Sequence, residues 1–455
     1  MSVQLVNPAD ESVLGVYEFD SDAEVEAALD QGEEAFHHWR RLGLETRLDC
    51  VRTFERALSS ARLSLAERIT LEMGKVHKES LAEVDKSISA CAALRENFPA
   101  WKSDREYTLP SGHSVTHSPL GIVLGIMPWN FPVWQVVRFA IPALLCGNAI
   151  LLKHAPNTWG VAEFLADLFR QAFPFAVYRN LKVDVSVVSG LLADDRVRGV
   201  SLTGSTRAGR SVAELAGRHL KKCVLELGGN DAYVILDDAD LDMAAEVCVS
   251  SRLLNAGQSC VAAKRFIVTA KNKDRFVDLM RERLAMVRFG HPADPGSRIG
   301  PLARKDLREA LHDQVRRSLA SGAELLLGGE IPHDRPGFYY PPSLLAEVRP
   351  GQAAFDEELF GPVAAVIEAV DEADAIRLAN RSVYGLGGAI FSRDVERARH
   401  LAEAEFDAGM VFINDLVRSE ASVPFGGTKD SGLGRELGRE GVLEFTNIKL
   451  IYARN

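Results

Sequence analysis

The sequence predicts an α/β protein with two parallel sheets, each covered by helices on both faces. Two stretches of the chain, 121–225 and 232–414, alternate short apolar segments with segments of helical period. Such alternation is typical of parallel strands joined by helices, because strands buried on both faces are apolar throughout. The length of 455 residues also exceeds what one core usually organises, which favours at least two domains.

The first hundred residues have the pattern of helices. Ser21 opens an amphipathic segment that runs from 22 to about 39, and further helical periods cover 44–101. Two short segments, 106–109 and 114–118, then change to a strand-like period around a Pro-Ser-Gly turn, which predicts a β-hairpin.

The two alternating stretches predict most of the remaining elements. In the first, we expect strands at 122–127, 149–152, 200–202 and 223–225 and helices at 134–146, 158–172 and 204–219. In the second, the expected strands include 265–268, 363–367 and 410–413. A final strand-like segment, 443–452, lies beyond both units, so the simplest partition is two α/β units, a hairpin and a separate terminal strand.

Composition and charge exclude several classes of protein. A net charge of −10 argues against nucleic acid or an anionic membrane surface as the main partner. No run of 18 apolar residues is present, so we expect no membrane span, and residues 1–10 lack a signal sequence. The six cysteines have no CxxC spacing, which indicates reduced thiols in a cytoplasmic protein and no zinc or other metal site.

A cysteine and a glutamate in small-residue segments are the clearest chemical signal. Cys260 ends the segment Asn-Ala-Gly-Gln-Ser-Cys, and Glu226 lies in Leu-Glu-Leu-Gly-Gly. A thiolate attacks a carbonyl carbon, and a carboxylate activates the water that hydrolyses the resulting thioester. The alternative is a buried core thiol and a surface carboxylate.

A second segment has the features of a phosphate-binding turn. Leu202–Gly209 follows a strand and opens a helix, so the backbone N–H groups near Gly204, Ser205 and Gly209 would face a pyrophosphate. The segment lacks the third glycine of the usual dinucleotide fingerprint, and any tight strand–helix turn has a similar composition. Lys153 ends the preceding strand, where it would meet a ribose hydroxyl or a 2′-phosphate unless it is an ordinary solvated lysine.

Five motifs together closely resemble the aldehyde dehydrogenase superfamily, and they match it in order and spacing from about Asn7 to the C-terminus. They are Pro128-Trp129-Asn130-Phe131-Pro132, Glu226-Leu227-Gly228-Gly229, Gly257-Gln258-Ser259-Cys260, Glu357-Glu358-Leu359-Phe360-Gly361-Pro362 and Pro424-Phe425-Gly426-Gly427.

The resemblance implies two doubly wound parallel-sheet domains and a small β element that bridges subunits. The implied NAD(P)-binding domain covers 1–104 and 120–227, the catalytic domain 228–425, and the bridging element 105–119 and 426–455. In the family this element pairs with another subunit, so we expect a homodimer or homotetramer. The alternative for the terminal strand is packing within its own chain.

The same resemblance assigns the chemistry. Cys260 is the expected nucleophile, the amide of Asn130 with the Cys260 backbone N–H is the expected oxyanion donor, and Glu226 is the expected general base. Members that pass the acyl group to coenzyme A generally lack this glutamate, so a free carboxylic acid is the expected product. The alternative for Asn130 is a turn residue.

The expected cofactor is NADP or NAD, with dual use and a lean to NADP. Many NAD-preferring members carry a glutamate three residues after the lysine, and Pro156 stands there instead, while Lys153 and His154 would add positive charge. Glu358 and Phe360 correspond to residues that hold the nicotinamide ribose and flank the ring. The complete expected cofactor set is Met127, Pro128, Trp129, Lys153, His154, Gly204, Ser205, Gly209, Leu227, Glu358 and Phe360.

Within the superfamily, three segments resemble the bacterial succinate-semialdehyde dehydrogenase branch: 134–139, 153–155 and 264–266. Arg138 would then bind the distal carboxylate of a semialdehyde bidentately, and the Ser419 hydroxyl would complete the pocket. Arg418 is an accessory candidate. Trp134 and Phe425 would supply apolar walls, or they belong to the core. The alternatives are a structural ion pair for Arg138 and a loop hydroxyl for Ser419.

Three other functions stay open at this point. Glutarate semialdehyde or a general aliphatic or aromatic aldehyde fits the same chemistry, because one methylene changes affinity only modestly. A catalytically silent structural or binding protein on this fold is a different class, as is a cysteine esterase that acts without cofactor.

Overall fold

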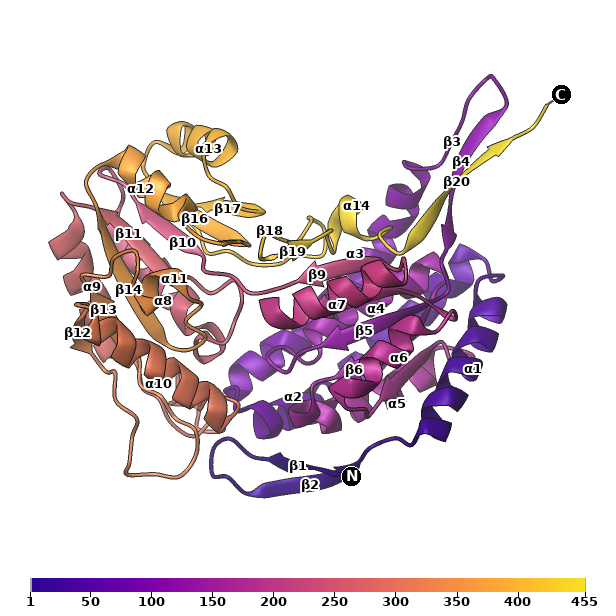
Figure 1. Cartoon of the computed structure of the whole chain (residues 1–455), viewed down its shortest axis with the longest axis horizontal. Coiled ribbons are helices and arrows are strands. Elements are labelled where there is room, and N and C mark those ends of the chain that lie inside the picture. The colour runs from indigo at the N-terminus through magenta and orange to yellow at the C-terminus, as the bar shows by residue number, and fades with distance from the viewer. Residues whose placement is uncertain (1, 455) are drawn as a thin grey trace.

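The computed structural model describes residues 2–454 and contains two mainly parallel sheets flanked by helices, with a small β arm that projects from one end (Figure 1). The predicted fold class is confirmed. The two sheets lie in separate halves of the molecule, and the segments that carry the expected site residues lie where the halves meet.

The first sheet has six strands in the order β19-β9-β8-β5-β6-β7, and every neighbouring pair except β19–β9 is parallel. Its strands are β5 (Ile122–Met127), β6 (Ala149–His154), β7 (Tyr178–Leu181), β8 (Val197–Thr203), β9 (Lys222–Glu226) and β19 (Gly432–Leu433). The last of these comes from the C-terminal part of the chain and pairs antiparallel with β9.

Helices cover both faces of this sheet and separate its core into two apolar clusters. One cluster takes side chains from α2 (Leu44–Met73), α3 (His77–Ser103), α4 (Trp134–Cys146) and α5 (Trp159–Ala172). The other takes them mainly from α1 (Asp22–Trp39), α6 (Val188–Ala193) and α7 (Thr206–Arg218). Short 3-10 turns at η1 (Pro156–Thr158) and η2 (Val185–Val187) complete the connections.

The second sheet has seven strands in the order β12-β13-β14-β11-β10-β16-β17, and only β12 is antiparallel to its neighbour. Its strands are β10 (Ala232–Ile235), β11 (Arg265–Thr269), β12 (Glu324–Leu327), β13 (Ser343–Ala346), β14 (Val363–Ala369), β16 (Gly387–Phe391) and β17 (Met410–Ile413). Its helices are α8 (Leu241–Leu253), α9 (Lys273–Ala285), α10 (Lys305–Ala320), α11 (Ala353–Asp356), α12 (Glu372–Asn380) and α13 (Val395–Ala404). The turn η3 (Leu254–Gly257) leads from α8 toward Cys260.

A three-stranded sheet forms the projecting arm, in the order β20-β4-β3. The predicted hairpin supplies β3 (Tyr107–Thr108) and β4 (His113–Pro119), and the terminal strand β20 (Thr446–Tyr452) pairs antiparallel with β4. Within the arm, Ile448 and Leu450 of β20 are 70% and 63% exposed. Two short elements complete the structure: β15 (Tyr384–Gly385) pairs antiparallel with β18 (Thr428–Lys429), and α14 (Gly438–Gly441) is a single helical turn.

The helical prediction for the first hundred residues is wrong for residues 2–18. These form an antiparallel hairpin of β1 (Ser2–Val6) and β2 (Val13–Glu18) at the lower edge of Figure 1. Only Leu5 among its strand residues is fully buried. Because the two strands bury so few side chains, their sequence does not need a strict alternation of apolar and polar residues. The hairpin takes its stability from the body of the protein, where Tyr17 and Phe19 pack edge-on against Trp159.

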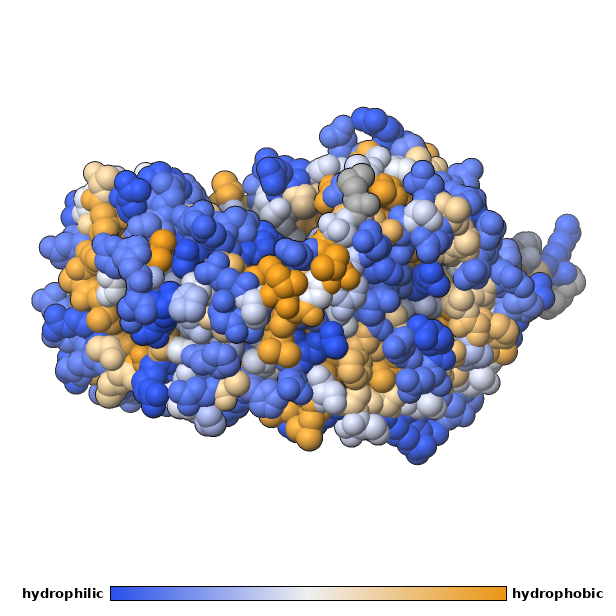
Figure 2. All heavy atoms as spheres, turned by 90° about the horizontal axis from the view of Figure 1, so that it is seen from below, coloured by the Kyte–Doolittle hydropathy of each residue, from blue (hydrophilic) through white to orange (hydrophobic). Residues whose placement is uncertain are grey.

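The surface of the lower face, seen in Figure 2, is mostly hydrophilic, with hydrophobic residues in small groups. Across residues 2–454, no helix is long and apolar enough to cross a membrane.

Candidate active site between the two sheets

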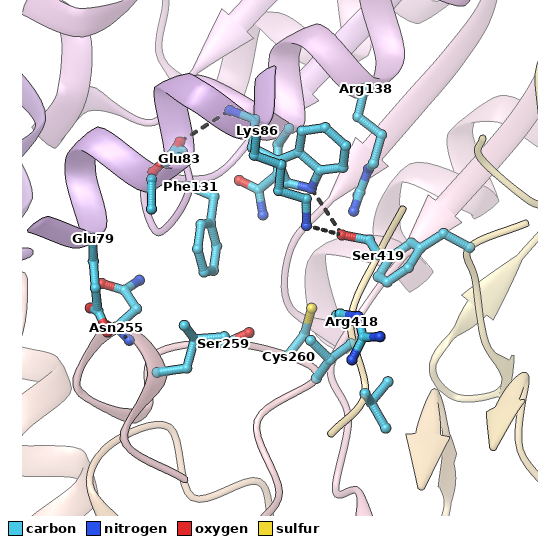
Figure 3. Close-up of a pocket in the computed structure, with 17 residues that line it drawn as sticks. Glu79, Glu83, Lys86, Phe131, Arg138, Asn255, Ser259, Cys260, Arg418 and Ser419 are labelled. Atoms are coloured by element: carbon cyan, nitrogen blue, oxygen red, sulfur yellow. Dashed lines mark hydrogen bonds between the residues drawn. The ribbon is translucent and has the colours of Figure 1, made fainter. Parts of the chain in front are cut away.

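A cavity of about 160 Å³ opens beside Cys260. Its walls come from α3, from α4 and the loop before it, from η3 and the segment that follows it, and from the loop 417–425 (Figure 3). Of the predicted catalytic and substrate residues, it brings together Cys260, Arg138, Trp134, Ser419 and Phe425. Asn130 and Glu226 are not among the residues that line this cavity, and both are buried.

The loop that presents Cys260 has an unusual backbone. Asn255 and Ala256 take left-handed φ angles of 54° and 53°, and Gly257 follows with φ 76°. A Cβ on Gly257 would lie 2.3 Å from the backbone of Gly361, so only glycine fits this approach. The sulfur of Cys260 points into the cavity in Figure 3, which excludes the alternative of a core thiol without access.

Lys264 fixes the other side of this loop. Its buried ammonium donates to the backbone carbonyls of Ser259, at 3.0 Å, and Cys260, at 2.5 Å, and lies 3.4 Å from a carboxylate oxygen of Glu358. Burial raises the pKa of the Cys260 thiol to about 11, and the positive charges of Lys264 and Arg138 oppose that rise. Sequence analysis noted Lys264 only as part of the segment 264–266 that resembles the family, and it predicted no role for this lysine.

Asn130 is held against the nucleophile loop. Its Nδ2 donates to the carbonyl of Gln258 at 3.1 Å, and its Oδ1 accepts from Gln135 at 3.1 Å. Asn255 donates to the Asn130 carbonyl at 2.8 Å, so the two loops are joined from both directions. An amide nitrogen has two hydrogens, and one of those on Nδ2 has no partner among the described residues.

Glu226 ends β9 and is only 2% exposed, so the alternative of a surface carboxylate is excluded. Within residues 2–454 neither of its carboxylate oxygens has a hydrogen-bond partner. Burial, reinforced by the neighbouring carboxylate of Glu436, raises its pKa well above the usual range, while Arg138 and Arg435 act against the shift. A buried carboxylate with unpartnered oxygens is suited to accept a proton from water.

Arg138 forms a structural ion pair, which was the alternative to substrate binding, and it also lines the cavity. Its guanidinium forms an ion pair with Glu436, donates to the Thr203 hydroxyl at 3.3 Å, and lies 4.5 Å from the centre of the Phe425 ring. Glu436 also accepts from the Ser201 hydroxyl at 3.2 Å. Sequence reasoning missed Glu436, because only the return of the C-terminal segment to the first sheet brings it to Arg138.

Ser419 is more than a loop hydroxyl. Its Oγ accepts from Trp134 Nε1 at 3.1 Å and from Lys86 Nζ at 2.9 Å, and both bonds are drawn in Figure 3. The Lys86 ammonium also lies 4.3 Å from the Trp134 ring centre. Lys86, on α3, was not predicted, and nothing in its local sequence separates it from other helix lysines. Arg418 lines the cavity while it pairs with Asp415 and Glu420.

The carboxyl ends of β5 and β6 hold the first expected cofactor residues. Met127 and His154 are register partners there, and Lys153 is 5% exposed, so it is not an ordinary solvated lysine. Lys153 forms no ion pair within the described chain, and burial lowers its pKa. The carboxylate of Asp184 acts on Lys153 only from beyond ion-pair distance, and Pro156 adds no acid. A buried cation without an ion-pair partner fits an anionic ligand.

The expected positive charge on His154 is wrong. The ring is fully buried, with Nε2 3.0 Å from the Pro132 carbonyl and Nδ1 2.9 Å from the Thr158 hydroxyl. Burial lowers its pKa to about 4, so the imidazole is neutral at physiological pH. Its hydrogen bonds instead tie the end of β6 to the loop that carries Asn130.

The turn after β8 opens a capped helix, but the expectation that the backbone N–H groups of Gly204 and Gly209 face a pyrophosphate is wrong, because both donate to carbonyls of the chain, that of Gly209 to Ser205 at 2.9 Å. Ser205 caps α7 by accepting from Ala208 N at 3.3 Å, and Gly204 N donates to the carbonyl of Glu226 at 2.9 Å. A Cβ on Gly209 would lie 2.5 Å from the side chain of Leu227. Gly209 therefore allows α7 to pack closely on the segment after β9.

The other half of the molecule contributes Glu358 and Phe360. Glu358 accepts from the backbone N–H of Gly229 at 3.1 Å. The ring of Phe360 meets that of Trp129, which with Pro128 follows β5, edge-on at 5.9 Å. Two contacts thus join segments of the two halves: Glu358 with Gly229 and Phe360 with Trp129. The buried, unpaired Lys153 and these two aromatic rings fit a nicotinamide dinucleotide. No cluster of three or more metal-ligating side chains occurs in the described part of the chain.

Comparison with known proteins agrees with this arrangement. A family model described as "Aldehyde dehydrogenase family" matches residues 1–451. The chain is 43% identical over 450 residues to succinate-semialdehyde dehydrogenase [NADP(+)] of Deinococcus radiodurans, covering 98% of this chain and 94% of the relative. It is also 43% identical over 449 residues to succinate semialdehyde dehydrogenase [NAD(P)+] Sad of Escherichia coli K12, covering 98% and 97%.

Solved structures give the same result. The succinic semialdehyde dehydrogenase of Streptococcus pyogenes, solved in complex with NADP+, superposes with a TM-score of 0.96 at 37% identity and covers 99% of this chain and all of that one. Betaine aldehyde dehydrogenase of Staphylococcus aureus, solved with NAD+, gives 0.95 at 29% identity, covering 99% and 91%. The chain belongs to the aldehyde dehydrogenase family and is an NAD(P)-dependent aldehyde dehydrogenase.

Proposed function

We propose that this enzyme oxidises succinate semialdehyde to succinate, with Cys260 as nucleophile and NADP+ as the better of two usable cofactors. The observation that carries the proposal is the cavity beside Cys260, whose walls hold a guanidinium, an ammonium and a hydroxyl from Arg138, Lys86 and Ser419. A short aldehyde with a carboxylate at its far end matches a cavity that holds both a nucleophile and cationic donors. The names of the two relatives at 43% identity support the same substrate.

The first step is addition of the Cys260 thiolate to the aldehyde carbon. Lys264 and Arg138 favour the thiolate because they oppose the rise that burial imposes on the thiol pKa. As the carbon–sulfur bond forms, the carbonyl electrons move to oxygen. The unpartnered hydrogen on Asn130 Nδ2 and the backbone N–H of Cys260 are the donors we assign to that oxyanion.

The residues expected to bind the cofactor would hold it beside Cys260, and the cofactor when bound supplies the acceptor for the aldehyde hydride. We assign Lys153 to the 2′-phosphate, the start of α7 at Ser205 to the pyrophosphate, and Glu358 to the nicotinamide ribose. Trp129 and Phe360 border the ring site. The unpaired charge of Lys153 and the absence of an acid at Pro156 support a preference for NADP+ over NAD+.

Hydrolysis of the thioester completes the reaction. Glu226 takes a proton from water, the hydroxide attacks the acyl carbon, and Cys260 leaves as a thiolate. Both oxygens of Glu226 lack protein partners among the described residues, so neither is committed to another donor. The product is the free carboxylate.

The proposed assembly and location rest on the exposed terminal strand and on the state of the cysteines. We propose a homodimer or homotetramer in which the exposed edge of β20 pairs with a second subunit, because Ile448 and Leu450 leave apolar surface on that strand. We propose a cytoplasmic location, since all six cysteines are free thiols, as is typical of a reducing compartment.

A rate assay tests the function directly. NADPH formation is followed with succinate semialdehyde, glutarate semialdehyde and an uncharged aldehyde, and each rate is repeated with NAD+. The proposal predicts the highest kcat/KM for succinate semialdehyde with NADP+, and no oxidation by C260A. A strong preference for NAD+ or for the uncharged aldehyde would contradict the cofactor or the substrate assignment, respectively.

A further inference from the structure

The cations that line the cavity differ in whether a carboxylate already neutralises them. Arg138 is paired with Glu436, and Arg418 is paired with Asp415 and Glu420. The third lining cation, Lys86, forms no ion pair with any described residue. Its charge is therefore the one that an anionic substrate meets unneutralised.

The two acidic side chains of the lining form no ion pair with Lys86. Glu83 pairs with Lys75 and accepts from the backbone N–H groups of Val133 and Trp134 at 2.8 and 3.0 Å. Glu79 lies 3.0 Å from Arg298. Each carboxylate has its own partner away from the Lys86 ammonium.

The hydrogen bonds around Ser419 determine which way its hydroxyl points. A hydroxyl oxygen has two acceptor sites and one hydrogen. Trp134 Nε1 and Lys86 Nζ occupy both acceptor sites of Ser419 Oγ, at 3.1 and 2.9 Å. The hydroxyl hydrogen is left to donate to a ligand. The Lys86 ammonium has three hydrogens, and one of them is donated in the hydrogen bond to Ser419. The other two remain available to a ligand.

We propose that Lys86 is a specificity-determining residue that binds the distal carboxylate of the substrate directly and orients the Ser419 hydroxyl as a second donor to it. This inference rests on the proposed function, because it requires a substrate with a carboxylate. The charge of Arg138 is balanced by Glu436, so Arg138 contributes hydrogen-bond donors and part of the cavity wall. Lys86 supplies the positive charge that attracts the carboxylate.

The position of Lys86 also makes recognition depend on pH. Burial lowers the pKa of Lys86 to about 8, and the positive charge of Arg138 on α4 adds to the effect. Glu83 on α3, Glu420 in the loop after Ser419, and Cys260 act in the opposite direction. The ammonium is charged below pH 8 and loses its proton above it. Affinity for a carboxylated aldehyde should therefore fall as the pH rises through about 8.

The test compares succinate semialdehyde with its methyl ester, which keeps the chain and removes the charge. In K86M, kcat/KM for the semialdehyde should fall about 10- to 100-fold, the range of one hydrogen bond between charged groups, while kcat/KM for the ester changes less than about twofold. K86R should recover a large part of the loss. K78M is the matched control, because Lys78 lies on the same helix and is exposed.

The pH profile supplies a readout that a purely structural role would not change. In the wild type, the ratio of kcat/KM for semialdehyde to ester should decline around pH 8, and the ratio cancels the titration of Cys260 and Glu226. In K86M the ratio should be flat, and in K86R the decline should move to higher pH. Binding of succinate to the enzyme without cofactor, measured by calorimetry, should weaken in K86M by the same factor as kcat/KM.

The outcomes separate the two proposals. Equal losses on both substrates in K86M, or no loss on either, would overturn the role of Lys86 and leave the proposed substrate intact. A wild type that prefers the methyl ester would overturn the substrate assignment and the anchor together.

Discussion

At the residue scale, the site contains buried charged side chains, and some of them lack a partner of opposite charge or a hydrogen-bond partner. Glu226 has no hydrogen-bond partner for either oxygen among residues 2–454, whereas Arg138, close by, is neutralised by Glu436. A carboxylate whose pKa is raised becomes a stronger base once it loses its proton, because its basicity increases with its pKa. Glu226 therefore gains activity as the pH rises through its folded-state pKa.

Replacement of Glu226 by Gln should separate the two halves of the reaction. Because the amide cannot take a proton from water, the steady-state rate should fall about 10²- to 10⁴-fold. Hydride transfer in the first turnover should persist, so stopped-flow absorbance should record a burst of one NADPH per active site. A variant that loses the burst as well would show that Glu226 acts before the thioester forms.

Lys264 is the residue that joins the nucleophile loop to Glu358. In K264M, the carbonyls of Ser259 and Cys260 lose a buried donor, so the free energy of unfolding should fall by about 2 kcal/mol. The pKa of the Cys260 thiol should rise, since a nearby positive charge is removed. The rate of alkylation by iodoacetamide as a function of pH reports the shift. An unchanged alkylation profile in a folded K264M would refute the electrostatic role.

Sequence reasoning at this scale reached the residues that lie in distinctive local segments. Cys260, Glu226 and Asn130 stand among glycines and prolines whose spacing is itself informative. Lys86 and Glu436 were missed because their roles arise only when α3 and the C-terminal segment pack against α4. His154 was misjudged for the converse reason, because burial removed the charge that its residue type indicated.

At the element scale, the alternating strands and helices were predictable because their burial follows from local sequence. The strand β5 is continuously apolar, and α4 is buried along its whole length. The hairpin of β1 and β2 was not predictable, since its exposed strands carry little pattern and its contacts with Trp159 are distant in sequence. The close packing of α7 on the first sheet depends on a single small residue.

Gly209 tests that packing. In G209A, the added methyl would lie 2.5 Å from Leu227, so α7 must move outward. Overpacking of this kind should lower the free energy of unfolding by about 1–3 kcal/mol, and NADPH affinity should weaken because the helix start is displaced. Fluorescence titration with NADPH measures the affinity. G217A on the same helix is the control: its Cβ meets nothing within 4 Å, and it should be neutral or stabilising. Equal NADPH affinity in both variants would contradict the assignment of this turn.

At the scale of the whole molecule, the arm of β20, β4 and β3 is the feature most suited to assembly. Its terminal strand leaves Ile448, Leu450 and Tyr452 more than half exposed. The sequence predicted this strand from its apolar, strand-like pattern. The apolar surface and the strand edge together favour pairing with a second subunit.

The double variant I448K/L450K should shift the protein toward monomers, because two charges would be buried in the proposed contact. Sedimentation velocity at several concentrations measures the mass. The variant should keep a folded body, checked by circular dichroism, since neither side chain belongs to the apolar cores. A monomeric wild type, or a variant with an unchanged mass, would contradict the proposed assembly.

The return of the C-terminal segment to the first sheet has a consequence for any attempt to divide the protein. The strand β19 completes that sheet beside β9, and Val442, Leu443 and Phe445 fill one of its cores. A fragment that stops at residue 227 would expose an unpaired edge and a hole lined with hydrocarbon, so we expect it to aggregate. Anyone seeking an independent dinucleotide-binding module should instead graft residues 428–446 back through a short linker.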